Sequence, residues 1–312
     1  MQQFEFVERL AGHIDRLPHA EAMFVANQLV MHRSDLAESS LQSLKSRVRN
    51  PDALKFLAGL CKQLAYIQDL TLFRDVKNDR DVLAKLYDVE GFFFAKGSSH
   101  PEKLLVVFTT MFNNFRLSNV VLYAMLKEMG VSVLILKDCT YFNFLNGVSG
   151  LGSDITSIAE SISDLANDNH ISNIYFTGFS SGGYASLYAS LLLPCSGYLG
   201  FSVPTDLSSG STRFPGKFFR DEVRRKIDEK HLLNLRTLAE SVDSHVPREI
   251  IFGEKSEVDA IHAANMAGLP NFKVTQLKGC GHQTVGALVE NHSFSSYLRN
   301  LLCCTEDKVS DR

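Results

Sequence analysis

Several features that would narrow the function are missing from this sequence. Its 312 residues carry a formal net charge of −3, so it lacks the positive surplus typical of a nucleic-acid partner. No run of about 18 or more apolar residues occurs, so no membrane span is expected. The first residues lack both a basic start and an apolar stretch, which argues against a signal peptide. We therefore expect a cytoplasmic protein that binds no nucleic acid.

The sequence is equally poor in signatures of metals, cofactors and disulfides. It has no P-loop, no G-x-G-x-x-G and no H-E-x-x-H motif, so we expect no cofactor and no metal. The six cysteines form no C-x-x-C pair, and several lie in apolar runs, as small buried hydrophobic residues do. A reduced compartment fits this usage, although the even number also allows disulfides. The cysteines are Cys61, Cys139, Cys195, Cys280, Cys303 and Cys304.

What is present divides the chain near residue 80. Before that point, apolar residues recur at helical spacing. The expected helices cover residues 3–15, 19–32, 34–48 and 52–68. We expect a helical N-terminal extension over residues 1–80 that packs on a catalytic domain over 81–312. The alternative is a pair of helical hairpins that loosely resembles a tetratricopeptide unit.

After residue 80, short β-rich runs alternate with helical runs. The expected elements include an opening hairpin of residues 82–87 and 91–95, a buried strand over 104–109, a mostly helical stretch over 218–242 and one closing helix over 285–303. This alternation predicts an α/β fold with a mostly parallel sheet and helices on both faces. Residues 208–243 are a candidate cap. In such sheets, sites form beyond the carboxyl ends of the strands.

A candidate nucleophile follows the apolar strand predicted over residues 173–177. The strand runs into the motif G-x-S-x-G, with Gly178, Ser180 and Gly182 at its fixed positions, and then into a helix. A sharp strand-to-helix turn brings backbones so close together that only glycine fits two residues before and two residues after the nucleophile. The backbone N–H of Ser181 then lies at a helix N-terminus, where it favours an oxyanion. Ser181 itself is a weaker candidate nucleophile, because glycine does not flank it at both required positions.

The general base and its acid partner should follow later strands. His282 lies between glycines on the loop after the last predicted strand, where the base is expected. Asp259 follows the preceding strand and is the favoured acid, with a structural alternative as a helix N-cap. Glu257, Glu254 and Asp206 remain open as alternative acids.

The loop after the strand over 104–109 should supply the second oxyanion donor. No His-Gly-Gly run is present there, so a backbone N–H near Thr110 or Met111 must serve. Asn113, Asn114 and Tyr141 fall on loops at the same edge of the sheet, and they are candidates for substrate binding. Ordinary turn and capping roles are the alternative for each of them.

These motifs resemble the α/β-hydrolase superfamily over residues 100–302, which implies that fold. The elbow at 180–184, the helix start at 259–263 and the loop at 279–282 are similar to those of small bacterial α/β-hydrolase-like proteins. The resemblance implies a serine hydrolase that cleaves an ester or related acyl bond in a small molecule or glycan through an acyl-enzyme. An acyltransferase on the same triad and a non-catalytic binding protein are the alternatives. The missing glycine-rich oxyanion loop departs from typical esterases.

Overall fold

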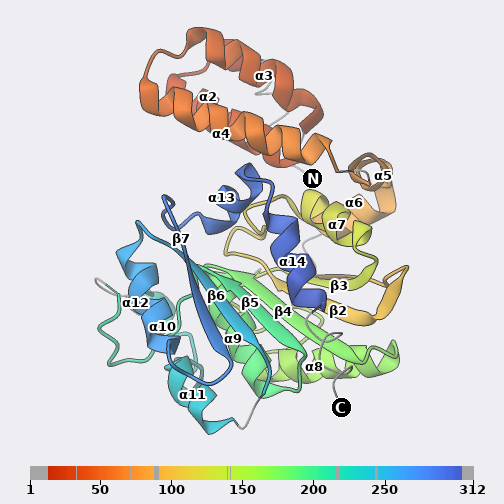
Figure 1. Ribbon diagram of the computed structural model, residues 1–312, viewed down its shortest axis with the longest axis vertical. Helices are drawn as coiled ribbons and strands as arrows, with labels where there is room; N and C mark the ends of the chain where they lie inside the picture. The colour runs from red at the N-terminus through yellow and green to blue at the C-terminus, as the bar shows by residue number, and fades with distance from the viewer. Residues whose placement is uncertain are drawn as a thin grey trace.

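A seven-stranded sheet forms the centre of the computed structural model, with the strand order β1-β3-β2-β4-β5-β6-β7 (Figure 1). The strands are β1 (Phe92–Ala95), β2 (His100–Phe108), β3 (Val131–Leu136), β4 (Asn173–Phe179), β5 (Gly197–Phe201), β6 (Arg248–Gly253) and β7 (Phe272–Leu277). The structure describes residues 13–32, 34–70, 72–87, 91–138, 140, 142–214, 218–242 and 245–303. Strand β1 is antiparallel to β3, and the other neighbouring pairs are parallel. The predicted mostly parallel sheet is confirmed.

Helices cover both faces of the sheet because its strands are apolar on both sides. In β2, Leu104 and Val106 join one hydrophobic cluster, whereas Leu105 and Val107 join another. The first cluster packs against α8 (Ile155–Asp168), α9 (Ser181–Leu192) and α12 (Glu257–Met266), and the second against α7 (Asn119–Glu128) and α14 (Phe294–Cys303). The helices cover the faces of the sheet, and the loops that follow the parallel strands lie at the carboxyl ends of those strands.

The described residues before the sheet are mostly helical. They comprise η1 (Ile14–Arg16), α2 (His19–His32), α3 (Ser34–Arg47), α4 (Pro51–Gln68), α5 (Phe73–Asn78) and α6 (Arg80–Tyr87). Helix α4 begins at Pro51 because the Asn50 side chain accepts hydrogen bonds from two N–H groups of its first turn. No described helix, the 18-residue α4 included, is apolar enough over such a length to cross a membrane.

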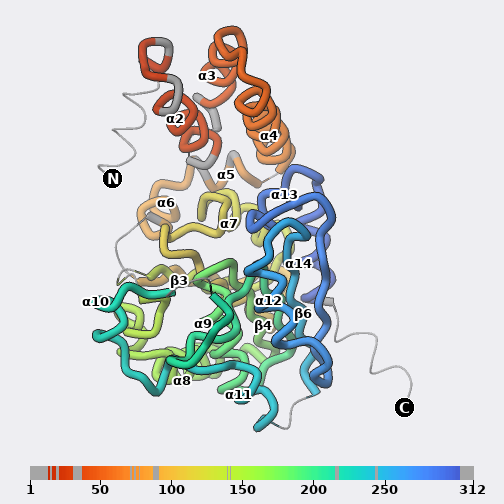
Figure 2. Tube along the Cα trace, turned by 90° about the vertical axis from the view of Figure 1, so that its left-hand side faces the viewer, coloured from red at the N-terminus to blue at the C-terminus, as the bar shows by residue number. Residues whose placement is uncertain are grey.

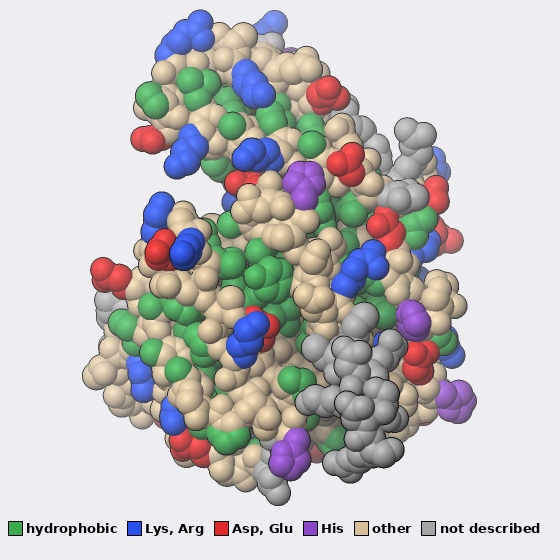
Figure 3. Space-filling model, in the orientation of Figure 1, with side chains coloured by type: hydrophobic (Ala, Val, Ile, Leu, Met, Phe, Trp, Pro, Cys, Tyr) green, Lys and Arg blue, Asp and Glu red, His purple; other side chains and the backbone are tan. Residues whose placement is uncertain are grey.

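Helices α2, α3 and α4 lie together at one end of the molecule, next to α13 (Thr284–Glu290) (Figures 1 and 2). Leu57, Leu60 and Leu64 of α4 belong to the same buried cluster as Val285 and Leu288 of α13. On the face seen in Figure 3, the surface is hollowed on one side between these helices and the rest of the molecule. The division of the chain at residue 80 stays a prediction, but one continuous core joins the two parts.

Two predicted elements in the second part of the chain are wrong. Residues 82–87 belong to helix α6 and not to a hairpin strand, because Val82, Leu83 and Leu86 fall on one helical face and Asp79 caps the first turn. The predicted closing helix is two helices, α13 and α14. The break lies at His292, whose φ of 55° cannot continue a right-handed helix.

The segment over 218–242 is less helical than predicted. It contains only α10 (Asp221–Arg224), η2 (Glu229–His231) and α11 (Leu235–Ser241) among its described residues. The Asp228 and Asn234 side chains each accept a backbone N–H two residues ahead, which starts a new short helix. A β-bridge between Asp206 and Asn234 ties this candidate cap to the chain just after β5.

Candidate active site

Ser180 stands at the sharp turn between β4 and α9. Its φ of 52° and ψ of −120° lie outside the ordinary regions for a residue with a side chain. Such a conformation costs about 1–3 kcal/mol and persists only where its surroundings enforce it. Here the Ser180 N–H donates to the Phe201 carbonyl, and the Ser180 carbonyl accepts from the Gly183 N–H, each at 2.9 Å. These bonds hold the serine above the end of β4.

The two glycines of the motif permit this turn by close contact. A Cβ on Gly178 would collide with the Ser186 hydroxyl and the Gly182 carbonyl of helix α9. A Cβ on Gly182 would collide with the backbone carbonyls at the end of β2. Glycine at both positions is therefore required by the close approach of the neighbouring backbone.

A chain of hydrogen bonds joins the serine to a histidine and a carboxylate. His282 Nε2 lies 2.9 Å from Ser180 Oγ, and His282 Nδ1 lies 2.9 and 3.0 Å from the two Asp259 carboxylate oxygens. The Asp259 side chain is 6 % exposed and the His282 side chain 41 %. A carboxylate only accepts hydrogen bonds, so Nδ1 must carry the proton and Nε2 is left to accept the serine proton.

Asp259 does not cap its helix, in contrast to the alternative suggested by the sequence. It is the third residue of α12, and the N-cap is Ser256, whose Oγ accepts from the Asp259 N–H at 3.4 Å. The helix therefore fixes the Asp259 backbone while its carboxylate is free to bind His282. This placement separates the capping role from the role predicted for the carboxylate.

The three alternative acids lie elsewhere in the described structure. Glu254 accepts the Gly279 N–H at 2.7 Å, so it holds the histidine loop and does not touch the imidazole. Glu257 is exposed. Asp206 lies 3.3 Å from the Arg213 guanidinium and accepts from Ser208. Of the four carboxylates considered, the structure brings Asp259 to His282.

Contacts that the sequence did not suggest hold the histidine loop. The Ser202 hydroxyl donates to the His282 carbonyl at 2.8 Å and lies 3.1 Å from the Thr284 hydroxyl. The ring of Phe179 lies 5.5 Å from the imidazole at an interplanar angle of 36°. Gly253 lies so close to the histidine loop that a Cβ on this residue would collide with the Gly281 carbonyl. The only sequence signal for Ser202 is its place directly after β5.

Within the described residues, the loop after β2 donates one hydrogen bond to the elbow. The Thr110 N–H is already bonded to the Asn114 carbonyl at 2.8 Å. The Met111 N–H instead donates to Ser181 Oγ at 3.0 Å, beside the nucleophile. The Ser181 N–H begins α9, where the first N–H groups have no partner within the helix. Of the two predicted loop donors, Met111 is the one that faces the elbow.

Asn113 and Asn114 both shape this loop. Asn114 accepts the Arg116 N–H through its side chain and donates to the Phe112 carbonyl. Asn113 has a φ of 55°, and its carbonyl accepts from the Asn119 side chain. Substrate contact by either residue stays a prediction. Tyr141, the third residue predicted to bind substrate, lies outside the described residues.

Two titratable groups nearby stay uncharged near neutral pH. Burial raises the pKa of the Cys280 thiol. Burial also lowers the pKa of His262 to about 4, and its Nδ1 accepts the Thr205 N–H. Among the described residues, neither side chain is hydrogen-bonded to Ser180 or His282.

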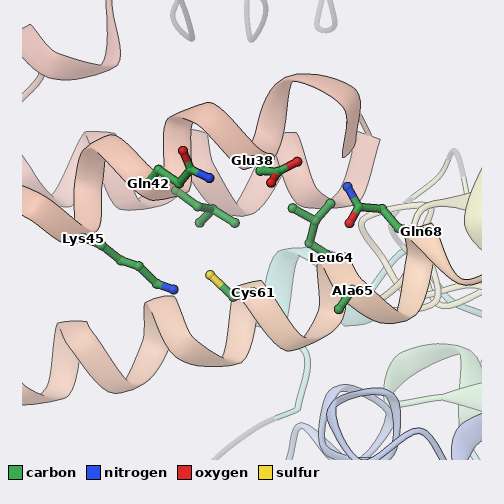
Figure 4. A pocket seen from close by; sticks show the side chains of 8 residues that line it. Glu38, Gln42, Lys45, Cys61, Leu64, Ala65 and Gln68 are labelled. Carbon is green, nitrogen blue, oxygen red and sulfur yellow. The ribbon is translucent and has the colours of Figure 1, made fainter.

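A small cavity of about 200 Å³ lies apart from the elbow, between α3 and α4 (Figure 4). Its lining includes Glu38, Lys45, Cys61 and Leu64. None of the elements that carry Ser180, Asp259 or His282 contributes to it. Within the described parts of the chain, no group of three or more histidine, cysteine or acidic side chains is arranged to hold a metal.

Comparison with known proteins identifies the fold. No protein-family model matches the sequence, and no curated protein matches it. The 2,6-dihydroxy-pseudo-oxynicotine hydrolase structure is 13% identical, covers 96% of this chain and 87% of its own, and has a TM-score of 0.53. MenH from S. aureus is 16% identical over 68% of this chain and 97% of its own, with a TM-score of 0.47. The carboxyl esterase 2 of Tuber melanosporum is 13% identical over 68% and 82%, with a TM-score of 0.45.

The chain has the α/β-hydrolase fold, as its motifs predicted. At such low identity the likeness extends to the fold and not to the activity. The likeness to the 2,6-dihydroxy-pseudo-oxynicotine hydrolase also includes most of the helical N-terminal part, because it covers 96% of the chain.

Proposed function

We propose that this protein is a serine hydrolase that cleaves an ester or related acyl bond through an acyl-enzyme on Ser180. The observation that carries the proposal is the continuous contact from Ser180 Oγ through His282 to the buried Asp259 carboxylate, with each distance at 2.9–3.0 Å. A serine hydroxyl is a poor nucleophile until a base removes its proton, and this arrangement supplies that base. Residues 81–312 would then be the catalytic domain.

In the acylation step, Ser180 Oγ bonds to the carbonyl carbon of the substrate while its proton moves to His282 Nε2. The carbonyl oxygen takes up the displaced electron pair and becomes an oxyanion. When the tetrahedral intermediate collapses, the bond to the leaving oxygen breaks and His282 returns the proton to that oxygen. The Asp259 carboxylate stabilises the imidazolium that exists between these two transfers.

In the deacylation step, a water molecule takes the place of the departed alcohol. His282 removes one proton from the water, and the resulting hydroxide attacks the acyl carbon. Collapse of the second intermediate breaks the bond to Ser180 Oγ, which recovers its proton from His282. The acid product leaves and the site returns to its starting state.

The oxyanion requires donors that are already aimed at it. The Ser181 N–H at the start of α9 is one donor, and the loop after β2 completes this side of the site through its Met111 N–H, which is directed at the elbow. The side chains that follow on this loop are apolar and exposed, Met111 by 43 % and Phe112 by 75 %. An apolar acyl group could pack against these side chains, and the ester would belong to a small molecule or a glycan.

The proposal is tested by turnover of p-nitrophenyl acetate and p-nitrophenyl butyrate. Ser180→Ala and His282→Ala should each lower the rate by about 10³-fold or more, because serine and histidine act as a unit. Ser241→Ala is a matched control, since this exposed serine in α11 bonds only to the Leu238 carbonyl within the part of the chain that the structure describes. Wild-type turnover by Ser180→Ala would contradict the proposal.

A further inference from the structure

The side chain of Ser181 has an unusual position for a serine in a helix. Within α9, Ser186 and Ser190 each donate to the carbonyl three residues earlier. Ser181 has no such carbonyl in its helix, because the residue three positions before it is Gly178 of β4, on the other side of the sharp turn. Its hydroxyl proton finds no acceptor among the residues that the structure describes, although Ser181 is only 7 % exposed.

The oxygen of the same hydroxyl is occupied. It accepts the Met111 N–H at 3.0 Å, the bond that joins the loop after β2 to the elbow. A hydroxyl can accept and donate at the same time, and its proton rotates to suit the acceptor available. When a hydroxyl accepts a hydrogen bond, it also becomes a stronger donor, because bonds in a chain polarise one another.

Resting on the serine hydrolase function proposed above, we propose that the Ser181 hydroxyl is a second donor to the oxyanion, beside the Ser181 N–H. It binds the negative oxygen through its own proton while its oxygen keeps the Met111 N–H in place. The backbone N–H and the hydroxyl of Ser181 would then both donate hydrogen bonds to the oxyanion. Met111 would act through Ser181 as a positioning residue.

This role explains how the site works without the glycine-rich loop of typical esterases. A glycine-rich loop presents its own N–H groups directly to the oxyanion. Here the loop is fixed by its own bonds, such as that from the Thr110 N–H to the Asn114 carbonyl, and offers the elbow one N–H. The Ser181 hydroxyl would link that N–H to the substrate oxyanion through a chain of two hydrogen bonds.

The test compares Ser181→Ala with Ser181→Thr, which keeps the hydroxyl, in the full-length protein. Loss of one oxyanion donor lowers kcat by about 10²–10³-fold with little change in KM. Ser181→Ala should show this loss, and Ser181→Thr should recover most of it. Thermal unfolding of each variant verifies that it is folded.

A second readout tests whether the loss lies in stabilisation of the oxyanion. A trifluoromethyl ketone forms a tetrahedral oxyanion adduct with an active serine, so its inhibition constant should rise in Ser181→Ala in parallel with the fall in kcat/KM. Wild-type turnover and inhibition by Ser181→Ala, with Ser180→Ala inactive, would overturn this inference alone. If the wild-type enzyme neither turned over esters nor bound the ketone, the proposed function would fall as well.

Discussion

His282 Nε2 lies 2.9 Å from Ser180 Oγ, although the two residues are 102 positions apart in the chain. The parallel strands β4 to β7 bring their following loops to one edge of the sheet. The histidine loop follows β7 and extends toward the end of β4. The Ser202 hydroxyl, which follows β5, stabilises this loop by donating to the His282 carbonyl. The pairing is thus a property of the whole sheet, and each part of it can be tested.

The first prediction concerns the carboxylate that orients His282. Asp259→Asn should lower kcat by about 10³–10⁴-fold with the fold intact, because an amide can donate to Nδ1 and so favours the wrong tautomer. The measurement is steady-state hydrolysis of a p-nitrophenyl ester by the purified variant.

The matched control for this carboxylate is Asp206→Asn. Asp206 is also buried, but it pairs with Arg213 and not with His282. This variant should lose stability while each folded molecule keeps its kcat. Equal losses of kcat in the two variants would contradict the assignment of Asp259.

The second prediction concerns the glycine that precedes the elbow. Gly178→Ala should lower the free energy of unfolding by about 1–3 kcal/mol or more, because the added methyl group collides with a backbone carbonyl of α9. Urea unfolding measures the loss. Gly210→Ala, with open space around the added carbon, should cost far less. Similar unfolding free energies for the two variants would refute the steric argument.

Much of the catalytic half of this structure could be predicted from the sequence. Continuous apolar runs mark strands that are buried on both faces, and the glycines around Ser180 mark the elbow. The sequence also pointed to Asp259 and His282, because both follow strands whose carboxyl ends share one edge. The choice among four carboxylates needed the fold, since only the packed loops show that Glu254 is bonded to Gly279.

Other features could not be predicted, for identifiable physical reasons. The helix over 82–87 looked like a strand, because a run of six mostly apolar residues is too short for its periodicity to distinguish the two without tertiary contacts. The break at His292 depends on one backbone angle that composition does not reveal. The bond between Met111 and Ser181 joins residues 70 positions apart and leaves no local pattern.

The third prediction concerns the contact between the N-terminal helices and the sheet domain. The buried Gln63 of α4 donates to the Glu290 carboxylate of α13 at 3.2 Å. Gln63→Ala should lower the free energy of unfolding by about 1–2 kcal/mol, because a hydrogen bond to a charged acceptor is lost. Denaturant unfolding measures this loss. The exposed Gln68 of the same helix is the control, and a larger loss for Gln68→Ala would contradict the contact.

The fourth prediction concerns stability in mild acid. Burial lowers the pKa of His262 from 6.5 to about 4, with Asp206, Arg213 and Asp259 as the charged groups that face it. His262 takes up its proton at a higher pH in the unfolded chain than in the folded one. Its contribution to the free energy of unfolding is therefore fully present above pH 6.5 and is lost as the pH falls toward 4. This histidine should account for about 2 kcal/mol of the loss between pH 7 and pH 5.

The measurement for His262 is the free energy of unfolding in urea at pH 7 and pH 5. In His262→Gln, which cannot take up a proton, the loss between the two values should be smaller than in the wild type. The comparison of slopes removes the general cost of the substitution at neutral pH. Parallel slopes would show that His262 is not the group responsible.

The most direct measurement of the central claim is the labelling of the protein by a fluorophosphonate, followed by mass spectrometry of its peptides. Activation of Ser180 by His282 predicts one adduct on Ser180 in the wild type, and a strongly reduced rate of labelling in His282→Ala. Labelling at another serine, or a rate that does not change when His282 is removed, would contradict the claim.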